Sequence, residues 1–273
     1  MLQSLNFFQS RDSVSRYSTW NSYPLVIADQ QQHIDMSMQL LQTIQPGDAP
    51  VLYWSIAKPE GLVLGFSQKL DVLNAESLAQ QQFPLYHRRA GGTAVHVGPH
   101  LLCLDVILPA GHPLILADVV ESYRWFGEAW AAALQRLGIE TRLVLPEEAH
   151  ARRTLLKQPD TRLYELLLNR ACYGSLSSYE VAVGERKVVG IDMLRRRVGS
   201  LLQAGVVLHW DTSILAQLLG QTTEEQQLLQ TGLLERAIGL DTIAGRVVDA
   251  GEVIAAFEQV LTTLSKNTPQ QEV

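Results

Sequence analysis

The fold is decided by residues 178–209, SYEVAVGERKVVGIDMLRRRVGSLLQAGVVLH, where apolar runs alternate with short turns. Three of these runs have the length and the β-branched content of strands, and they lie at about 178–184, 186–195 and 200–209. Tight turns are predicted between them, at Gly184-Glu185 and near Val198-Gly199. Consecutive strands joined by tight turns pair in opposite directions. The stretch therefore predicts an antiparallel sheet.

Outward from this stretch, shorter apolar runs predict further strands at about 51–57, 61–66, 85–88, 93–97, 101–108 and 140–145. The break at Pro59-Glu60-Gly61 is typical of a hairpin between the first two. Helices are expected at about 27–44, from Asp71 or Asn74 to 82, and at 117–137, 213–219, 232–238 and 250–265. Residues 146–171 are basic and polar, and we expect a long functional loop there.

The class predicted is α+β, with a mostly antiparallel central sheet flanked by helices and a small helical C-terminal segment. A single core suits a chain of 273 residues. We expect an N-terminal extension over 1–24, a main domain over 25–211, and a helical segment over 212–273 that packs on the same domain.

The composition excludes several classes of protein. A hydrophobic content of 47% is ordinary for a soluble globular protein, and a net charge of −6 argues against nucleic acid as the main partner. No run approaches the roughly 20 apolar residues of a membrane span. The N-terminus lacks the apolar core of a signal peptide, since Arg11 and Asp12 interrupt it. A reducing, cytoplasmic compartment is the simplest expectation.

The two cysteines lie in opposite contexts. Their separation forms no disulfide framework and no zinc-ligand spacing, so no metal is predicted. Cys103, in LLCLDVIL, is expected to behave as a small buried hydrophobe. Cys172, in NRACYGSLSSYE, lies among small and polar residues at a predicted turn. It is a candidate nucleophile, and a structural cysteine is an equally good interpretation of the local sequence.

Two further segments have the composition of a binding site. His87-Arg88-Arg89-Ala90-Gly91-Gly92-Thr93 places arginines and glycines where a strand ends, which suits an anionic ligand, although a plain Gly-Gly turn with solvated arginines fits equally well. Gly184-Glu185-Arg186-Lys187-Val188-Val189-Gly190 opens an apolar strand with Lys187. Lys187 could approach Cys172 if the strands following each residue pair. An ordinary solvated hairpin lysine is the alternative.

These segments together resemble the biotin/lipoate protein ligase superfamily, most closely octanoyltransferases of the LipM type. The resemblance rests on four motifs in order: Leu64-Gly65-Phe66-Ser67-Gln68, Arg88-Arg89-Ala90-Gly91-Gly92, Cys172-Tyr173 with Ser175 and Ser178-Tyr179-Glu180, and Arg186-Lys187-Val188-Val189-Gly190. It covers roughly residues 24–264, nearly the whole chain.

The resemblance implies an acyltransferase of lipoate biosynthesis. Cys172 would accept an octanoyl or lipoyl group from the thioester of acyl carrier protein, with Lys187 as its charged partner. The acceptor would be a lysine of a lipoyl domain, such as the glycine cleavage H protein or a 2-oxoacid dehydrogenase acyltransferase subunit. No cofactor is implied. The residues implied to bind substrate are Gly65, Gln68, Arg88, Arg89, Gly91, Gly92, Thr93 and Gly190.

The chain departs from the family pattern at two places. His96 comes one position early, so on a strand it would face the opposite side. Asp192-Met193 replaces the usual alanine-glutamine pair, which suggests an altered acyl or acceptor pocket. The acyl chain is expected in an apolar tunnel, whose walls would come from residues 63–66, Ala94-Val95 and the strand of Val188.

Three alternatives remain open. One is an ATP-dependent lipoate-protein ligase, in which Lys187 and the Arg-Arg-Ala-Gly-Gly turn hold an acyl-adenylate and Cys172 is incidental. Another is amidotransfer between lipoyl domains, which also uses a cysteine. The third is a degenerate homologue that binds an acylated partner without turning it over.

Overall fold

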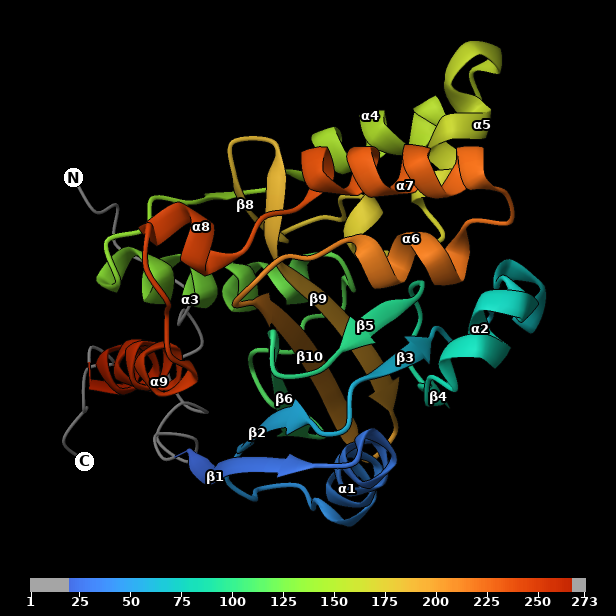
Figure 1. The fold of residues 1–273 in the computed structure, drawn as a ribbon. Helices are drawn as coiled ribbons and strands as arrows, with labels where there is room; N and C mark the ends of the chain where they lie inside the picture. The colour runs from blue at the N-terminus through green and yellow to red at the C-terminus, as the bar shows by residue number, and fades with distance from the viewer. Residues whose placement is uncertain (1–19, 267–273) are drawn as a thin grey trace, which may run out of the picture.

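The computed structural model describes residues 20–266, and Figure 1 shows a large central sheet between layers of helices. Seven strands form this sheet in the order β1-β2-β6-β10-β9-β8-β7, and every neighbouring pair except β1–β2 is antiparallel. Their bounds are β1 Asn21–Ala28, β2 Val51–Ala57, β6 Leu101–Pro109, β7 Arg142–Leu143, β8 Val181–Val183, β9 Arg186–Arg196 and β10 Gly199–Val207.

A second, smaller sheet stands beside the first. It has three strands in the order β4-β3-β5, with bounds β3 Gly61–Leu64, β4 Leu85–His87 and β5 Val95–Val97. The helices are α1 Gln30–Thr43, α2 Ala75–Gln81, α3 Glu121–Arg136, α4 Pro146–Leu155, α5 Pro159–Leu168, α6 Ser213–Leu219, α7 Thr223–Arg236, α8 Leu240–Ala244 and α9 Ala250–Lys266. The mostly antiparallel α+β class predicted from sequence is confirmed.

Helices cover both faces of the large sheet. Alternate residues of a strand point to opposite sides. Leu102, Leu104 and Val106 of β6 pack with α3 and α9, where Trp54, Trp130 and Phe257 form the centre of the main core. On the other face Tyr53, Ile107 and Leu201 pack under α1. The region of this second face that α1 leaves uncovered is where the cavity lies.

Helices α2, α6 and α7 pack against the small sheet through a separate apolar cluster. This cluster includes Leu62 and Leu64 of β3 and Leu229 and Leu233 of α7, all fully buried. Within residues 20–266, no helix is long and apolar enough to cross a membrane.

The predicted loop over 146–171 is wrong, because it contains α4 and α5. Each begins with a proline in its first turn, a position where the missing N–H costs no hydrogen bond. Charged residues make up much of α4, so its sequence shows no helical spacing of apolar residues. The predicted 51–57/61–66 hairpin is also wrong, since β2 and β3 belong to different sheets.

Other predicted boundaries need correction at both ends of the chain. The helix expected over 27–44 begins only at Gln30, and part of the predicted N-terminal extension belongs to β1, which pairs with β2. The remainder of the extension lies outside the described residues. The piece expected at 232–238 is the end of the longer α7, and α8 was not predicted.

Candidate active site

A cavity of about 640 Å³ lies between the uncovered face of the large sheet, the small sheet and helices α4 and α5. Six of the residues proposed from sequence line it: Arg88, Gly92, Thr93, Cys172, Lys187 and Gly190. The other four, Gly65, Gln68, Arg89 and Gly91, do not. The sequence motifs therefore converge on one place, with some members in contact with the cavity and others supporting its walls.

Cys172 lies in a turn, as predicted, which is the short 3-10 helix η3 (Cys172–Gly174), and β8 follows it in the chain. Its backbone N–H donates to the Ala94 carbonyl at 2.8 Å, and the Ala94 N–H donates to the Arg170 carbonyl at 3.1 Å. These two bonds fix the thiol-bearing turn against the end of the small sheet. The cysteine is partly exposed to the cavity.

Lys187 is almost fully buried, with a side chain 1% exposed. Its ammonium donates to both carboxylate oxygens of Glu180, at 2.9 and 3.0 Å, and to the backbone carbonyl of Cys172 at 2.7 Å. An ammonium has three donors, so these acceptors use them all. Burial raises the pKa of Glu180, although the Lys187 ammonium opposes that effect. The lysine thus binds the backbone of the cysteine.

Glu180 reaches this lysine through an uncommon backbone conformation. The preceding residue, Tyr179, has a φ of +65°, a left-handed value that is rare for a bulky side chain. The Tyr179 N–H donates to the Val144 carbonyl at 2.7 Å, and the Ser177 N–H donates to Glu180 at 2.7 Å. The turn therefore directs the carboxylate inward. Glu180 belongs to the third sequence motif, but the motif spacing does not predict that it pairs with Lys187.

Tyr173 packs against the large sheet beside the Lys187 ammonium. The Lys187 ammonium is 5.1 Å from the centre of its ring, within cation–π range. The Tyr173 hydroxyl donates to the Gly205 carbonyl at 2.7 Å. A side chain at Gly205 would collide with the same ring, because a Cβ there would lie 2.7 Å from its hydroxyl, whereas a Cβ at Gly190 would make an ordinary contact at 3.5 Å. Gly205 thus makes room for Tyr173.

The two arginines of the glycine-rich turn differ. Arg88 donates to the carbonyls of Gly91 and Thr93, at 2.8 and 3.1 Å, and its Nε lies 3.9 Å from the Asp192 carboxylate. Arg89 is exposed and does not reach the cavity. Gly92 has a φ of +83°, and a Cβ there would lie 2.3 Å from Arg88 and 3.9 Å from the Cys172 sulfur. A glycine at 92 therefore opens the approach to the thiol.

Gly65 packs against the backbone of this glycine-rich turn, and Gln68 is bonded to Gly65. The Gln68 side chain accepts from the Gly65 N–H at 3.3 Å and donates to the Arg170 carbonyl at 3.0 Å. A Cβ at Gly65 would lie only 1.9 Å from the Gly92 carbonyl oxygen. The first motif thus supports the second through backbone contact.

Replacing Gly65 with alanine should therefore destabilise the protein by about 3 kcal/mol or shift the turn, because a backbone oxygen cannot move aside as a side chain can. Gly91→Ala is the matched control. A Cβ at Gly91 meets nothing within 4 Å, so a change within about 0.5 kcal/mol is expected. Urea unfolding of both variants measures this, and equal effects at the two positions would contradict the packing described.

The floor of the cavity is more polar than the predicted tunnel. A row of paired residues crosses four strands on the cavity face: Tyr53, Asp105, Gln203 and Asp192. Asp105 accepts from the Gln203 amide at 2.9 Å and from the Ser37 hydroxyl, and burial raises its pKa to about 6. Cross-strand register brings this row together, which single-sequence motifs do not show.

The apolar wall of the cavity also differs from the prediction. Val63 and Val95 line it as expected, joined by Val97 and Leu101. Phe66 instead lies on the surface, 67% exposed. Leu64 and Ala94 pack in the cluster behind the small sheet.

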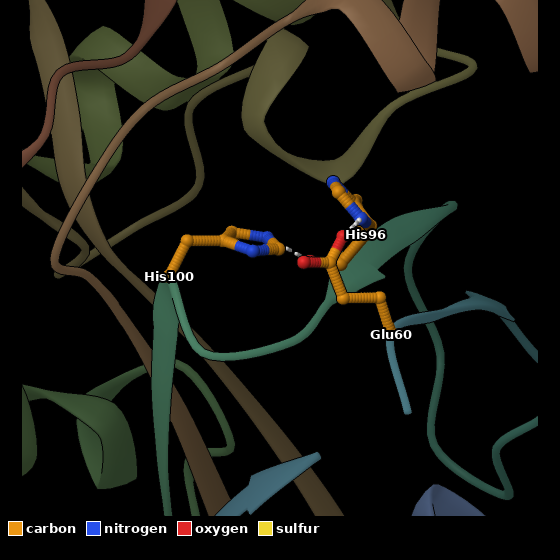
Figure 2. Close-up of side chains that lie close together, drawn as sticks. All are labelled: Glu60, His96 and His100. Carbon is orange, nitrogen blue, oxygen red and sulfur yellow. Dashed lines mark hydrogen bonds and ion pairs between the residues drawn. The ribbon is translucent and has the colours of Figure 1, made fainter. Parts of the chain in front are cut away.

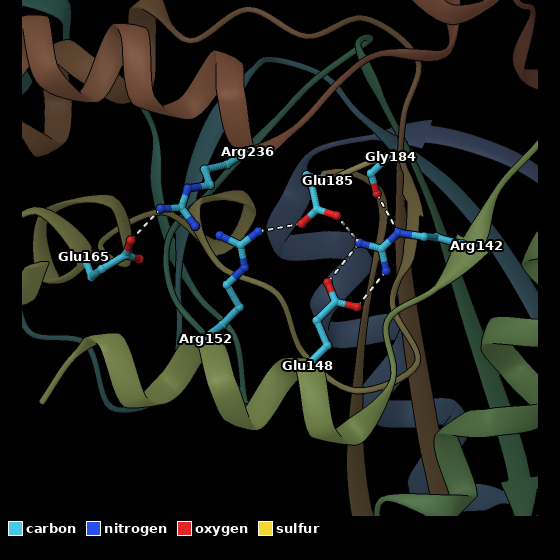
Figure 3. A network of polar contacts seen from close by, with 7 residues as sticks. All are labelled: Arg142, Glu148, Arg152, Glu165, Gly184, Glu185 and Arg236. Carbon is cyan, nitrogen blue, oxygen red and sulfur yellow. Dashed lines mark hydrogen bonds and ion pairs between the residues drawn. The ribbon is translucent and has the colours of Figure 1, made fainter. Parts of the chain in front are cut away.

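Arginines line the opposite side of the cavity, on α4 and α7. Figure 3 shows Arg152 paired with Glu185 and Arg236 paired with Glu165, at 2.7 and 2.5 Å. Glu185 also pairs with Arg142 at 3.1 Å, which in turn binds Glu148. Arg152, Arg153 and Arg236 all line the cavity. Arg152 and Arg236 are each paired with a glutamate here, so this side of the cavity carries charges of both signs.

The model of the lipoyl protein ligase A/B catalytic domain matches residues 29–262. The chain belongs to this family. Among its relatives is the octanoyltransferase LipM of Exiguobacterium sibiricum, 30% identical over 77% of this chain and 73% of the relative. The LipM of Moorella thermoacetica is 27% identical over 90% of this chain and 86% of the relative.

Solved structures share the fold of the family. The bipartite lipoate protein ligase of Thermoplasma acidophilum superposes with a TM-score of 0.69 at 17% identity, covering 90% of this chain and 83% of the other. LipL1 of P. falciparum, solved in complex with lipoate, has a TM-score of 0.61 at 14% identity and covers 93% of this chain and 65% of the other. These similarities agree with the α+β fold seen in Figure 1.

Proposed function

We propose that this protein is an octanoyltransferase of lipoate biosynthesis that works through a thioester on Cys172. The observation that supports transfer over ATP-dependent ligation is the set of bonds made by Lys187. All three donors of its ammonium bind Glu180 and the Cys172 carbonyl, which leaves none for an acyl-adenylate. The lysine is bound to the cysteine that a transferase needs.

The proposed reaction has two steps. The Cys172 sulfur attacks the carbonyl carbon of the donor thioester, a new carbon–sulfur bond forms, and the donor thiol leaves with the proton that Cys172 gives up. The amine of an acceptor lysine, in its neutral form, then attacks the acyl-enzyme. An amide bond forms, the Cys172–acyl bond breaks, and the proton of the amine returns to the thiolate. No energy-rich cofactor is consumed.

Lys187 is a positioning residue in this scheme, because it contacts the Cys172 backbone rather than the reacting sulfur. Its bond to the carbonyl holds the turn η3, and its buried charge lies close to the place where negative charge develops on the thiolate and the tetrahedral intermediate. The Glu180 carboxylate keeps the lysine in this place.

The surroundings of the cavity support carrier domains as substrates. An acyl carrier protein presents its acyl group on a phosphopantetheine arm, and Arg152, Arg153 and Arg236 offer donors for a phosphate or an acidic surface at the cavity. A lipoyl domain as acceptor is supported by the archaeal relative of this fold, which is described together with its E2 lipoyl domain.

The acyl chain is proposed to lie against the apolar wall of Val63, Val95, Val97 and Leu101. The polar row that contains Asp105 bounds this wall on the sheet side. Packing a methylene chain against a buried carboxylate is unfavourable in free energy, because the chain offers the carboxylate no hydrogen bond. The row therefore marks where the pocket ends for a saturated chain.

Transfer and ligation differ in their need for ATP. We expect the purified chain to modify a lipoyl domain with octanoyl-loaded acyl carrier protein in the absence of ATP, as followed by intact mass of the lipoyl domain. Free octanoate with ATP and magnesium should yield no product. Modification only in the second mixture would establish a ligase, and no product in either would exclude both transfer from carrier protein and ligation; both results overturn the proposal.

A further inference from the structure

Glu60, His96 and His100 form a compact cluster outside the proposed active site. Each offers one metal-ligating atom, and these atoms lie within 4.8 Å of one another. Figure 2 shows the Glu60 carboxylate between the two imidazole rings. The sequence predicts no metal from its cysteine spacing, and Glu60 and His96, 36 positions apart, come together only because β3 pairs with β5.

This cluster faces away from the cavity. His96 occupies the middle of β5, and its neighbours Val95 and Val97 line the cavity. Alternation along a strand sends the histidine to the other side, as the sequence register predicts. There its ring packs against Phe83, with 5.4 Å between ring centres. A ligand bound by His96 would therefore not contact Cys172.

The geometry is close to that of a zinc site. Two ligands of a tetrahedral zinc ion are about 3.3 Å apart, given zinc–ligand distances of about 2.0–2.2 Å. The His96 Nε2 lies 3.0 Å from the Glu60 carboxylate. The ligand atoms of all three residues lie within 4.8 Å of one another, so they would have to approach by about 1.5 Å or less to bind one ion.

The hydrogen bonds leave ring nitrogens available. The His100 Nε2 lies 3.1 Å from the His96 backbone carbonyl and can only donate to it, which leaves the other nitrogen with a free lone pair. Metal-binding histidines are commonly fixed by such a bond. The His96 side chain is 7% exposed, and its Nε2, which lies 3.0 Å from the Glu60 carboxylate, is the nitrogen that faces the cluster. Its Nδ1 points away from Glu60 and would carry the proton when Nε2 binds a metal.

The charged groups around the cluster also suit a divalent cation. The Asp211 carboxylate lies close enough to act on both rings. His209, the other nearby titratable group, is held by Asp241 at 2.6 Å.

We propose that Glu60, His96 and His100 bind a zinc ion that joins the β2–β3 turn to β5 and the turn after it. Two neutral imidazoles and a carboxylate are ligands that zinc accepts, with a water in the fourth position. The ion would stabilise the small sheet, whose Val63, Val95 and Val97 form the apolar wall of the cavity. Its role is structural, and it takes no part in acyl transfer.

The test uses the untagged full-length chain with Cys172→Ala, which removes a competing thiol ligand. Competition with a chromogenic zinc chelator should show one tight zinc ion per chain. Adding His100→Ala or Glu60→Gln should weaken binding by at least about tenfold. His150→Ala, an exposed histidine on α4, is the matched control and should bind zinc unchanged.

A second measurement separates ligation from loss of folding. Zinc should raise the melting temperature of the Cys172→Ala chain and of its His150→Ala control, but not that of the His100→Ala variant, whose metal-free melting temperature serves as the check on folding. Cobalt in place of zinc should give the intense visible absorption of a tetrahedral site. Failure of the parent chain to bind zinc, or binding that neither His100→Ala nor Glu60→Gln weakens, would overturn the proposal.

Discussion

Replacement of Cys172 by alanine is expected to abolish octanoyl transfer, with a loss of at least about a thousandfold in rate. The reason is that removing a nucleophile leaves only the contribution of binding. The cavity has room for the smaller side chain, since the thiol is partly exposed there. The folded structure should therefore survive. The measurement is the initial rate of lipoyl-domain modification from octanoyl-loaded carrier protein, with circular dichroism to verify the fold.

Cys103 is the matched control for this experiment. It also lines the cavity, but burial raises the pKa of its thiol to about 12, so it remains protonated at neutral pH and is a poor nucleophile. Cys103→Ala should still form the acyl-enzyme. A Cys172→Ala protein that transfers octanoyl at the rate of the unaltered chain would rule out the covalent mechanism.

The second large effect is expected at the buried pair of Lys187 and Glu180. Lys187→Met leaves a carboxylate that is only 3% exposed without its cation. Breaking a buried pair in this way typically costs about 3–5 kcal/mol in free energy of unfolding. Glu180→Gln should cost less than Lys187→Met, because an amide keeps a hydrogen-bonding oxygen for the ammonium. Chemical denaturation at pH 7 provides the comparison.

The double variant Lys187→Met/Glu180→Gln separates stability from function. With both charges removed, much of the lost stability should return, whereas transfer should stay slow because nothing holds the Cys172 carbonyl. Arg246→Met, which breaks an exposed pair with Glu252, is the control and should leave stability nearly unchanged. Full activity of the double variant would show that Lys187 does not position the cysteine.

The fold could be predicted where the sequence alternates clearly. The strands from Arg186 and from Gly199 lie within one or two residues of their predicted positions, since one side of each strand is apolar and turns bound both ends. Helix α4 was not predicted because charged residues dominate its sequence, and α5 was not predicted because Leu163 and Leu166 are exposed, so its apolar residues do not mark one face. Pro146 and Pro159, each in a first helical turn, were the available signal.

The site could be predicted in part. The order of four motifs was enough to place Cys172 and Lys187 together, but their contact runs through a backbone carbonyl and a glutamate, which motif spacing does not reveal. The polar row of Asp105, Gln203 and Asp192 depends on the pairing of β6, β9 and β10. Contacts between strands that are far apart in the sequence depend on how the strands are aligned, and this alignment is known only from the folded sheet.

The most direct test of the central claim is the intact mass of this chain after incubation with octanoyl-loaded acyl carrier protein. The mechanism predicts one octanoyl adduct, which hydroxylamine removes and which peptide mapping places on Cys172. The adduct should disappear when a lipoyl domain is added, as the acyl group passes to its lysine. An unmodified Cys172 in a preparation that still octanoylates the lipoyl domain would contradict the account.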